Sequence, residues 1–153
     1  MVIYLVQHGK ARDKQQDPER GLSDEGRRQT LAVGRNLLDA GVSPMEIWHS
    51  GKTRARQTAE ILGQQLQFPR PVRAVAGMSP NDDPLRFAEQ QLRDRDQLML
   101  VGHLPFMDRL VALLVTGSTE NRVCAFRNSA VVSLESDADS ERWWITSMTV
   151  AGL

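Results

Sequence analysis

The hydrophobic positions of this chain fall into short continuous runs, separated by longer segments in which apolar residues recur periodically. Residues 2–7 and 97–102 hold two such runs, dominated by Val, Leu, Ile and Met. Continuous apolar runs of this length are typical of strands that a parallel sheet buries on both faces. Further strands are predicted at residues 45–48, 130–134 and 143–148, the last two joined by a turn at 136–140.

The periodic segments predict four helices, and capping signals mark their ends. Ser23 precedes two acidic residues and predicts an N-cap, while Gly41 predicts the end of that helix. The second helix is predicted to begin near Thr53 and to end before Pro69. The last two helices are predicted to begin with a proline in the first turn, and they cover residues 84–92 and 105–117.

The order of these elements predicts one α/β domain that spans residues 1–153. Strands that alternate with helices form a mostly parallel sheet with helices on both faces, a three-layer α/β/α arrangement. The two final strands follow each other without a helix, so they are expected to run antiparallel. A chain of 153 residues is long enough to bury the core of one such domain.

Composition narrows the range of partners. The chain has 19 basic and 19 acidic residues, so neither nucleic acid nor an anionic membrane is expected as its main partner. No run reaches the roughly 18 apolar residues of a membrane span, and the N-terminal run lacks the basic flank of a secretory signal. The single cysteine, Cys124, excludes an intrachain disulfide, and these features together predict a cytoplasmic protein.

Two histidines occupy equivalent positions in this pattern. His8 and His103 each follow directly after a buried strand, at the carboxyl edge where open α/β sheets bind ligands. Arg54 lies in the first turn of the helix after the second strand, which opens onto the same edge. Two imidazoles, a guanidinium and the helix N-termini together predict a site for a dianionic phosphate, with a nucleophile built in.

Gly9 and His49 lie near these residues in the sequence, and the two site histidines raise the possibility of a metal site. Gly9 has no side chain, so a ligand could approach the backbone there. His49 also follows a strand, but a surface or turn role accounts for it. The two histidines after the buried strands have no third ligand at suitable spacing, so neither a metal nor a cofactor is expected.

Four segments of the chain resemble the histidine phosphatase superfamily, which also contains the cofactor-dependent phosphoglycerate mutases. They read Leu-Val-Gln-His-Gly, Leu-Ser-Asp-Glu-Gly, Ser-Gly-Lys-Thr-Arg-Ala-Arg-Gln-Thr and Val-Gly-His-Leu-Pro, at residues 5–9, 22–26, 50–58 and 101–105. They follow the family's order over essentially the whole chain, and the short chain is most similar to the SixA-type phosphohistidine phosphatases. The resemblance implies a phosphoglycerate mutase-like fold and a metal-independent phosphatase.

The resemblance also implies roles for individual residues. His8 is expected to be the nucleophile that becomes transiently phosphorylated, and Arg54 to clamp the phosphoryl oxygens. His103 is expected to hydrogen-bond the phosphoryl group and to stabilise charge in the transition state. Arg20 matches the arginine that the short members place before the Leu-Ser/Thr helix start, which implies a further phosphate ligand.

The chain departs from the family at position 7, where Gln7 stands in place of the arginine that precedes the nucleophile. Glutamine can donate a hydrogen bond to phosphate, but it brings no charge. Loss of a charged clamp is expected to cost on the order of 10²–10³ in rate, by analogy with the removal of an oxyanion donor. Lys10 is close in sequence and is a candidate to restore the charge.

A second departure concerns the proton donor. Many members that cleave oxygen esters carry a glutamate between the second and third helices, and residues 75–83 contain none. An alkoxide leaving group needs a proton from a positioned acid, whereas the imidazole of phosphohistidine is far less demanding. The missing glutamate therefore favours a phosphorus–nitrogen bond as the target. Asp82 and Asp83 remain as candidate acids, although helix capping before Pro84 is the expected role.

Three functions are compatible with these residues. The first is hydrolysis of phosphohistidine on a protein, for example a phosphorelay or phosphotransfer protein, through phospho-His8. The second keeps the chemistry but acts on a small phosphate ester. The third is a catalytically weakened module that binds phosphate or a phosphoprotein, for which Gln7 is the support. A mutase is not expected, because the chain is too short for the substrate-enclosing segments of those relatives.

Overall fold

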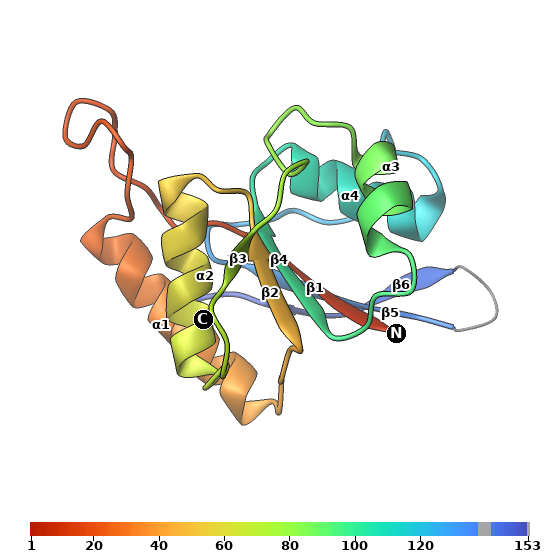
Figure 1. Cartoon of the computed structure of the whole chain (residues 1–153), viewed down its shortest axis with the longest axis horizontal. Helices are drawn as coiled ribbons and strands as arrows, with labels where there is room; N and C mark the ends of the chain where they lie inside the picture. The colour runs from red at the N-terminus through yellow and green to blue at the C-terminus, as the bar shows by residue number, and fades with distance from the viewer. Residues whose placement is uncertain (138–141, 153) are drawn as a thin grey trace.

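The computed structural model describes residues 1–137 and 142–152, and it has three layers. A six-stranded sheet is covered on one face by α1 (Asp24–Asp39) and α2 (Thr53–Gln65), as Figure 1 shows. The other face carries α3 (Pro84–Phe87), the π-helical segment η1 (Ala88–Leu92) and α4 (Phe106–Thr116). The predicted three-layer arrangement is confirmed. No helix in the described part of the chain is both long and apolar enough to span a bilayer.

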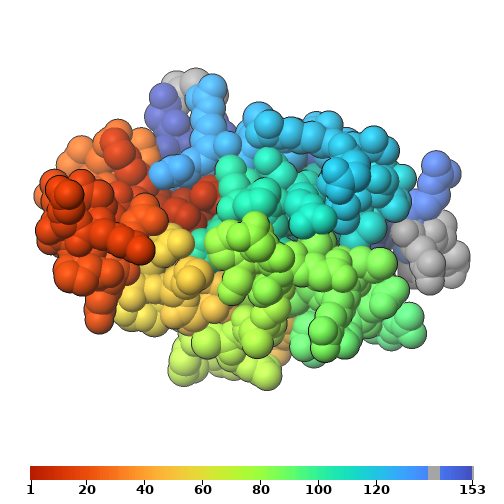
Figure 2. All heavy atoms as spheres, turned by 90° about the horizontal axis from the view of Figure 1, so that it is seen from above, coloured from red at the N-terminus to blue at the C-terminus, as the bar shows by residue number. Residues whose placement is uncertain are grey.

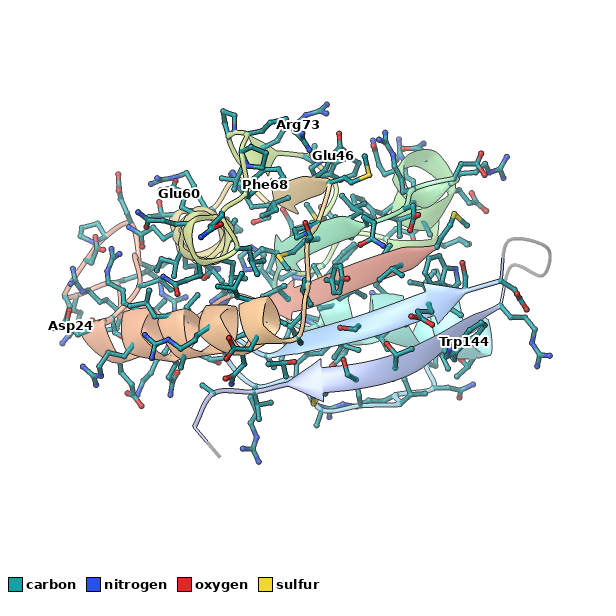
Figure 3. The ribbon with its side chains drawn as sticks, turned by 90° about the horizontal axis from the view of Figure 1, so that it is seen from below. Asp24, Glu46, Glu60, Phe68, Arg73 and Trp144 are labelled. Atoms are coloured by element: carbon teal, nitrogen blue, oxygen red, sulfur yellow. The ribbon has the colours of Figure 1, made fainter. Side chains whose placement is uncertain are left out.

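The six strands follow the order β3-β2-β4-β1-β5-β6 across the sheet. Their bounds are β1 Val2–Gln7, β2 Glu46–His49, β3 Arg73–Ala74, β4 Leu98–Gly102, β5 Val131–Ser136 and β6 Trp143–Thr149. The strands from β3 to β1 pair in parallel, while β5 pairs antiparallel with both β1 and β6. The predicted mostly parallel sheet with late antiparallel strands is confirmed. Figure 3 shows β6 at the edge of the sheet, carrying the exposed Trp144.

The core has two halves, one on each face of the sheet. Ile3 and Leu5 of β1 pack with residues of α3 and α4, whereas Tyr4 and Val6 pack with residues of α1 and α2. All four side chains are at most 8% exposed. A strand that is buried on both faces cannot alternate apolar with polar residues, which explains the continuous apolar run at its sequence positions.

Helix ends follow the predicted capping signals. Ser23 caps α1, because its side chain accepts a hydrogen bond of 3.0 Å from a backbone N–H of the first turn. Asp83 caps α3 in the same way, also at 3.0 Å. Gly117 ends α4 in the left-handed region at φ +81°, where glycine has no steric cost.

Several element predictions need correction. Strand β3 is only two residues long, and because both are exposed it has no apolar run that could have predicted it. The predicted helix at 84–92 is one α-helical turn that continues as η1. His49 is the buried last residue of β2 instead of the residue after the strand. The predicted turn at 136–140 begins in β5, and its residues 138–140 lie outside the described residues.

The pairing of β1 with β4 brings the two predicted site histidines together. Gln7 is the register partner of Gly102, and the backbone N–H of His8 donates to the carbonyl of Gly102 at 3.0 Å. His8 and His103 therefore leave the sheet side by side. Strand β2 pairs with the other side of β4, so the start of α2 opens onto the same edge.

We expect Gly26→Ala to lower the free energy of unfolding by about 1–3 kcal/mol, the usual cost of forcing a methyl group into a packed site. A Cβ on Gly26 would overlap the backbone carbonyl of Lys10, so the first turn of α1 would have to move away from the segment that follows His8. Urea denaturation measures the loss. Arg27→Ala, at an exposed position of the same turn, is the matched control with little change, and equal stabilities of the two variants would contradict the packing argument.

Candidate active site

Two imidazole rings form the centre of the site. The ring centroids of His8 and His103 lie 5.0 Å apart, with an angle of 55° between the ring planes. Figure 2 looks onto this edge of the molecule, where the red N-terminal segment, the yellow α2 region and the teal start of α4 adjoin. The structure thus brings together the two histidines that the strand pattern placed at one edge.

The His8 ring is neutral and has its lone pair on Nε2. Its Nδ1 lies 2.7 Å from the carbonyl oxygen of Gly9, and because a carbonyl only accepts, Nδ1 carries the proton. The pKa of His8 is lowered to about 4, mainly by burial and to a lesser extent by the positive charges of Arg54 and Arg20, while the Gly9 hydrogen bond acts in the opposite direction. At neutral pH the Nε2 lone pair is therefore available to an electrophile.

His103 is buried and is held by a serine that the sequence pattern did not single out. Its Nε2 lies 2.6 Å from Oγ of Ser50, the residue that follows β2. The pKa of His103 is lowered to about 3, mainly by burial and to a lesser extent by repulsion between its imidazolium form and His8, Arg54 and Lys52. Its Nδ1 is buried and has no hydrogen-bond partner among the residues that the structure describes.

Arg54 and Arg20 supply positive charge next to the rings. Arg54 lies in the first turn of α2, and its buried Nε has no partner in the described part of the chain. Burial and the charge of Arg20 lower the pKa of Arg54, which shows that two cations share this space. Arg20 has a left-handed backbone with φ +52°, and its Nε donates to the carbonyl of Arg12 at 3.2 Å. An anion bound next to the two imidazole rings would therefore neutralise both arginines.

Two polar residues of α2 hold the site segments in place. Thr58 Oγ1 accepts a hydrogen bond from the Gly9 amide at 2.9 Å and donates to the carbonyl of Arg54 at 2.7 Å. Gln57 Oε1 accepts from the amide of Leu22 at 2.7 Å, two residues beyond the Arg20 position. Both side chains belong to the segment at residues 50–58 that resembles the family, but the backbone groups that they bind are evident only in the fold.

Packing around Gly9 leaves little room for a side chain. Its amide already donates to Thr58, so this N–H is not free for phosphate. A Cβ at this position would lie 2.9 Å from Thr30 Oγ1 and 3.1 Å from Ser129 Oγ. The turn after His8 is therefore packed closely against these hydroxyl groups, and the expected contact of Gly9 with phosphate stays a prediction.

Lys10, the residue expected to restore the charge beside Gln7, is paired with a carboxylate. Its Nζ forms an ion pair of 2.6 Å with Glu25 Oε2 on the surface, and both side chains are about half exposed. Gln7 itself is only 6% exposed, and its Oε1 has no hydrogen-bond partner among the described residues. The structure therefore leaves position 7 neutral and commits Lys10 to a carboxylate.

In the described part of the chain, no carboxylate is among the charged groups that shift the pKa of His8 or His103. Asp83 caps α3, and Asp82 Oδ2 accepts a hydrogen bond from the amide of Ser79 at 2.8 Å, so both candidate acids have local roles. His49 Nδ1 accepts a hydrogen bond from the amide of Gly51 at 3.1 Å, which is a turn-forming role. Among residues 1–137 and 142–152, no group of three or more His, Cys, Asp or Glu side chains is arranged to hold a metal ion.

The pKa of His8 is directly testable. In the protein without ligand, the ring proton resonances of His8 should titrate with a midpoint near pH 4 in an NMR experiment, and tungstate should raise that midpoint because a bound dianion favours the imidazolium. Since this pKa lies below the unfolded value of about 6.5, His8 contributes stability above pH 6.5 that is lost as the pH falls towards 4. His8→Ala assigns the resonance, and a midpoint near 6.5 would contradict the burial argument.

Arg54 should favour anion binding at the expense of stability. We expect Arg54→Met to leave the free energy of unfolding unchanged or to raise it by up to about 1 kcal/mol, because it removes a half-buried cation without a counter-charge. The stabilisation that tungstate gives to the wild type should disappear in this variant, as thermal unfolding with and without the anion would show.

The matched control is Arg56→Ala, which removes an exposed arginine paired with Glu60 at 2.8 Å. It should lose only about 0.3–0.5 kcal/mol and keep the response to tungstate. If Arg54→Met kept that response, Arg54 would not be an anion ligand.

Comparisons with known proteins agree with this geometry. The family model described as histidine phosphatase superfamily (branch 1) matches residues 3–79. An uncharacterized protein of Picosynechococcus sp. is 29% identical over 161 residues, which cover 96% of each chain. A solved structure of the protein histidine phosphatase SixA with tungstate superposes with a TM-score of 0.83 at 23% identity, covering 98% of this chain and 97% of the other.

A second solved structure shares the fold. It is described as the putative phosphohistidine phosphatase SixA from Agrobacterium tumefaciens, with a TM-score of 0.77, 23% identity, and coverage of 99% of this chain and 98% of that one. The family model covers the segments that hold His8, Arg20 and Arg54, and the fold likeness extends over the whole chain. The chain therefore belongs to the histidine phosphatase superfamily.

Proposed function

We propose that this protein is a phosphohistidine phosphatase that removes the phosphoryl group from a protein histidine through a phospho-His8 intermediate. The observation that carries the proposal is the state of His8: a neutral ring with its Nε2 lone pair free, beside uncompensated cations. A nucleophile and an anion site thus occur together. The SixA relatives described above support this substrate class.

In the first step, His8 Nε2 attacks phosphorus and the bond from phosphorus to the substrate imidazole breaks. The substrate ring carries a proton on its other nitrogen, so it leaves as a neutral imidazole with the electron pair of the broken bond. His8 becomes a phosphoimidazolium, whose proton stays on Nδ1 and is donated to the Gly9 carbonyl oxygen. Arg54 and Arg20 bind the phosphoryl oxygens during the transfer, and His103 stabilises their charge.

In the second step, water attacks phosphorus and the bond to His8 Nε2 breaks. The electron pair returns to Nε2, His8 is neutral again, and the protons of water leave with the phosphate product as dihydrogen phosphate. The low pKa of His8 makes the neutral ring the favoured state of the free enzyme, so the nucleophile is regenerated without a separate base.

The surroundings of the histidines favour a phosphorus–nitrogen bond over an oxygen ester. The charged groups that shift the pKa of His8 and His103 are all basic, and the two aspartates of the 75–83 segment are engaged in local hydrogen bonds. An alkoxide would leave without a proton donor, whereas a protonated phosphohistidine brings its own good leaving group. A phosphorelay or phosphotransfer protein of the cytoplasm is the proposed substrate.

A second candidate function has one observation in its favour. Gln7 is neutral and buried where the family has arginine, and its Oε1 has no partner among the described residues. A site that binds phosphate or a phosphoprotein but turns it over slowly would follow from that missing charge.

Turnover of a phosphohistidine peptide, with a small phosphate ester in parallel, tests the proposal. The wild type should release phosphate from the peptide faster than from the ester, and EDTA should have no effect. His8→Ala should abolish release, while His103→Ala should lower it by roughly 10²–10³ and let an acid-labile phosphoenzyme accumulate. His49→Asn is the matched histidine control, because the amide oxygen can still accept from Gly51.

Each alternative gives a different result. Faster release from the ester would assign a small phosphate ester as the substrate. Tungstate binding without turnover of either substrate, even at high enzyme concentration, would assign the binding module. Full activity of His8→Ala would overturn the covalent mechanism.

A further inference from the structure

The first turn of α2 lacks the residues that usually stabilise a helix N-terminus. Its N-cap position is Lys52, which makes no side-chain capping bond, and the first turn holds no acidic residue. Lysine is a poor N-cap, and a cation at the positive end of the helix dipole is unfavourable. Helix α1 has the favourable arrangement instead, with a serine cap and two acids in its first turn. A local violation of this kind is expected where function requires it.

Three cations crowd this helix end, and only one of them is neutralised. Arg56 forms an ion pair with Glu60, whereas Arg54 and Lys52 take part in none of the ion pairs found among residues 1–137 and 142–152. The Lys52 side chain is exposed, so it is free to move towards a ligand.

Lys52 lies on the His103 side of the site. Its backbone N–H is 3.4 Å from Ser50 Oγ, and that oxygen in turn lies 2.6 Å from His103 Nε2. The cations are divided between the two rings: Arg20 and Arg54 act on His8, whereas Arg54 and Lys52 act on His103. Positive charge therefore flanks both imidazoles.

We propose that Lys52 binds a phosphoryl oxygen of the substrate from the His103 side and supplies the positive charge that the chain lacks at position 7. This inference rests on the proposed function, because it names a further ligand of the same phosphoryl group. Gln7 is neutral and Lys10 is paired with Glu25, so Lys52 is the lysine that the fold leaves unpaired beside the histidines. The unfavourable helix start is then the cost of a cation that only a bound anion satisfies.

Calorimetric titration with tungstate and with inorganic phosphate tests this without requiring turnover. Lys52→Ala should bind both anions roughly five- to tenfold more weakly at low salt, as expected for one exposed charge acting on a dianion. Lys52→Arg should retain most of the affinity, and the deficit of Lys52→Ala should shrink at high salt because screening removes the contribution of an exposed charge. Lys14→Ala is the matched control, since it removes the same charge from the loop that projects from the body in Figure 1.

A second variant separates binding from folding. Lys52→Ser introduces a favourable N-cap, so it should raise the melting temperature while it weakens tungstate binding. A merely structural role of Lys52 would move both quantities in the same direction. Gln7→Arg in the Lys52→Ala background should restore the lost affinity if the two positions supply the same charge.

The outcomes distinguish this inference from the proposed function. Equal anion affinities for Lys52→Ala and Lys14→Ala would overturn the role of Lys52, whether or not the wild type releases phosphate. Weaker binding by Lys52→Ala alone, in a protein that turns over no phosphohistidine, would support the role of Lys52 and refute the phosphatase. A wild type that binds neither tungstate nor phosphate would overturn both.

Discussion

The parallel register of β1 against β4 is the constraint on which the site depends. It places Gln7 opposite Gly102, so that the two strands end at the same level and the imidazoles that follow them face each other. A shift by one residue would turn every side chain of β1 to the opposite face and would exchange the two halves of the core. Burial on both faces therefore fixes the distance between His8 and His103 far more firmly than any contact within the site.

The residues that could be predicted from the sequence are those at the ends of periodic elements. His8 and His103 follow buried strands and Arg54 begins a helix, so hydrophobic patterning and topology suffice to bring them to one edge. Side chains that act through neighbours in space could not be predicted in this way. Lys10 is two positions from His8 and pairs with a surface carboxylate, whereas Ser50 reaches the second histidine from the end of another strand.

The fold, like the site, could be predicted from the sequence only where local patterns determine it. Layers, sheet type and helix caps follow from apolar runs and from capping chemistry, which are local properties of the chain. Strand β3 is exposed and exists only because the neighbouring β2 offers it a partner edge. The change from α-helix to π-helix at Ala88 likewise has no signal in hydrophobic spacing, because it adds one residue to a turn without changing the buried face at Phe87 and Leu92.

The hydrogen bond between His8 Nδ1 and Gly9 affects how this site tolerates substitutions. The proton of His8 Nδ1 is held by the main-chain oxygen of Gly9, not by a carboxylate side chain. The direction of the reactive lone pair is thus set by backbone geometry, which no exchange of a neighbouring side chain can delete. The charges around the ring can therefore differ, as the neutral Gln7 illustrates, while the direction of the Nε2 lone pair stays with the turn.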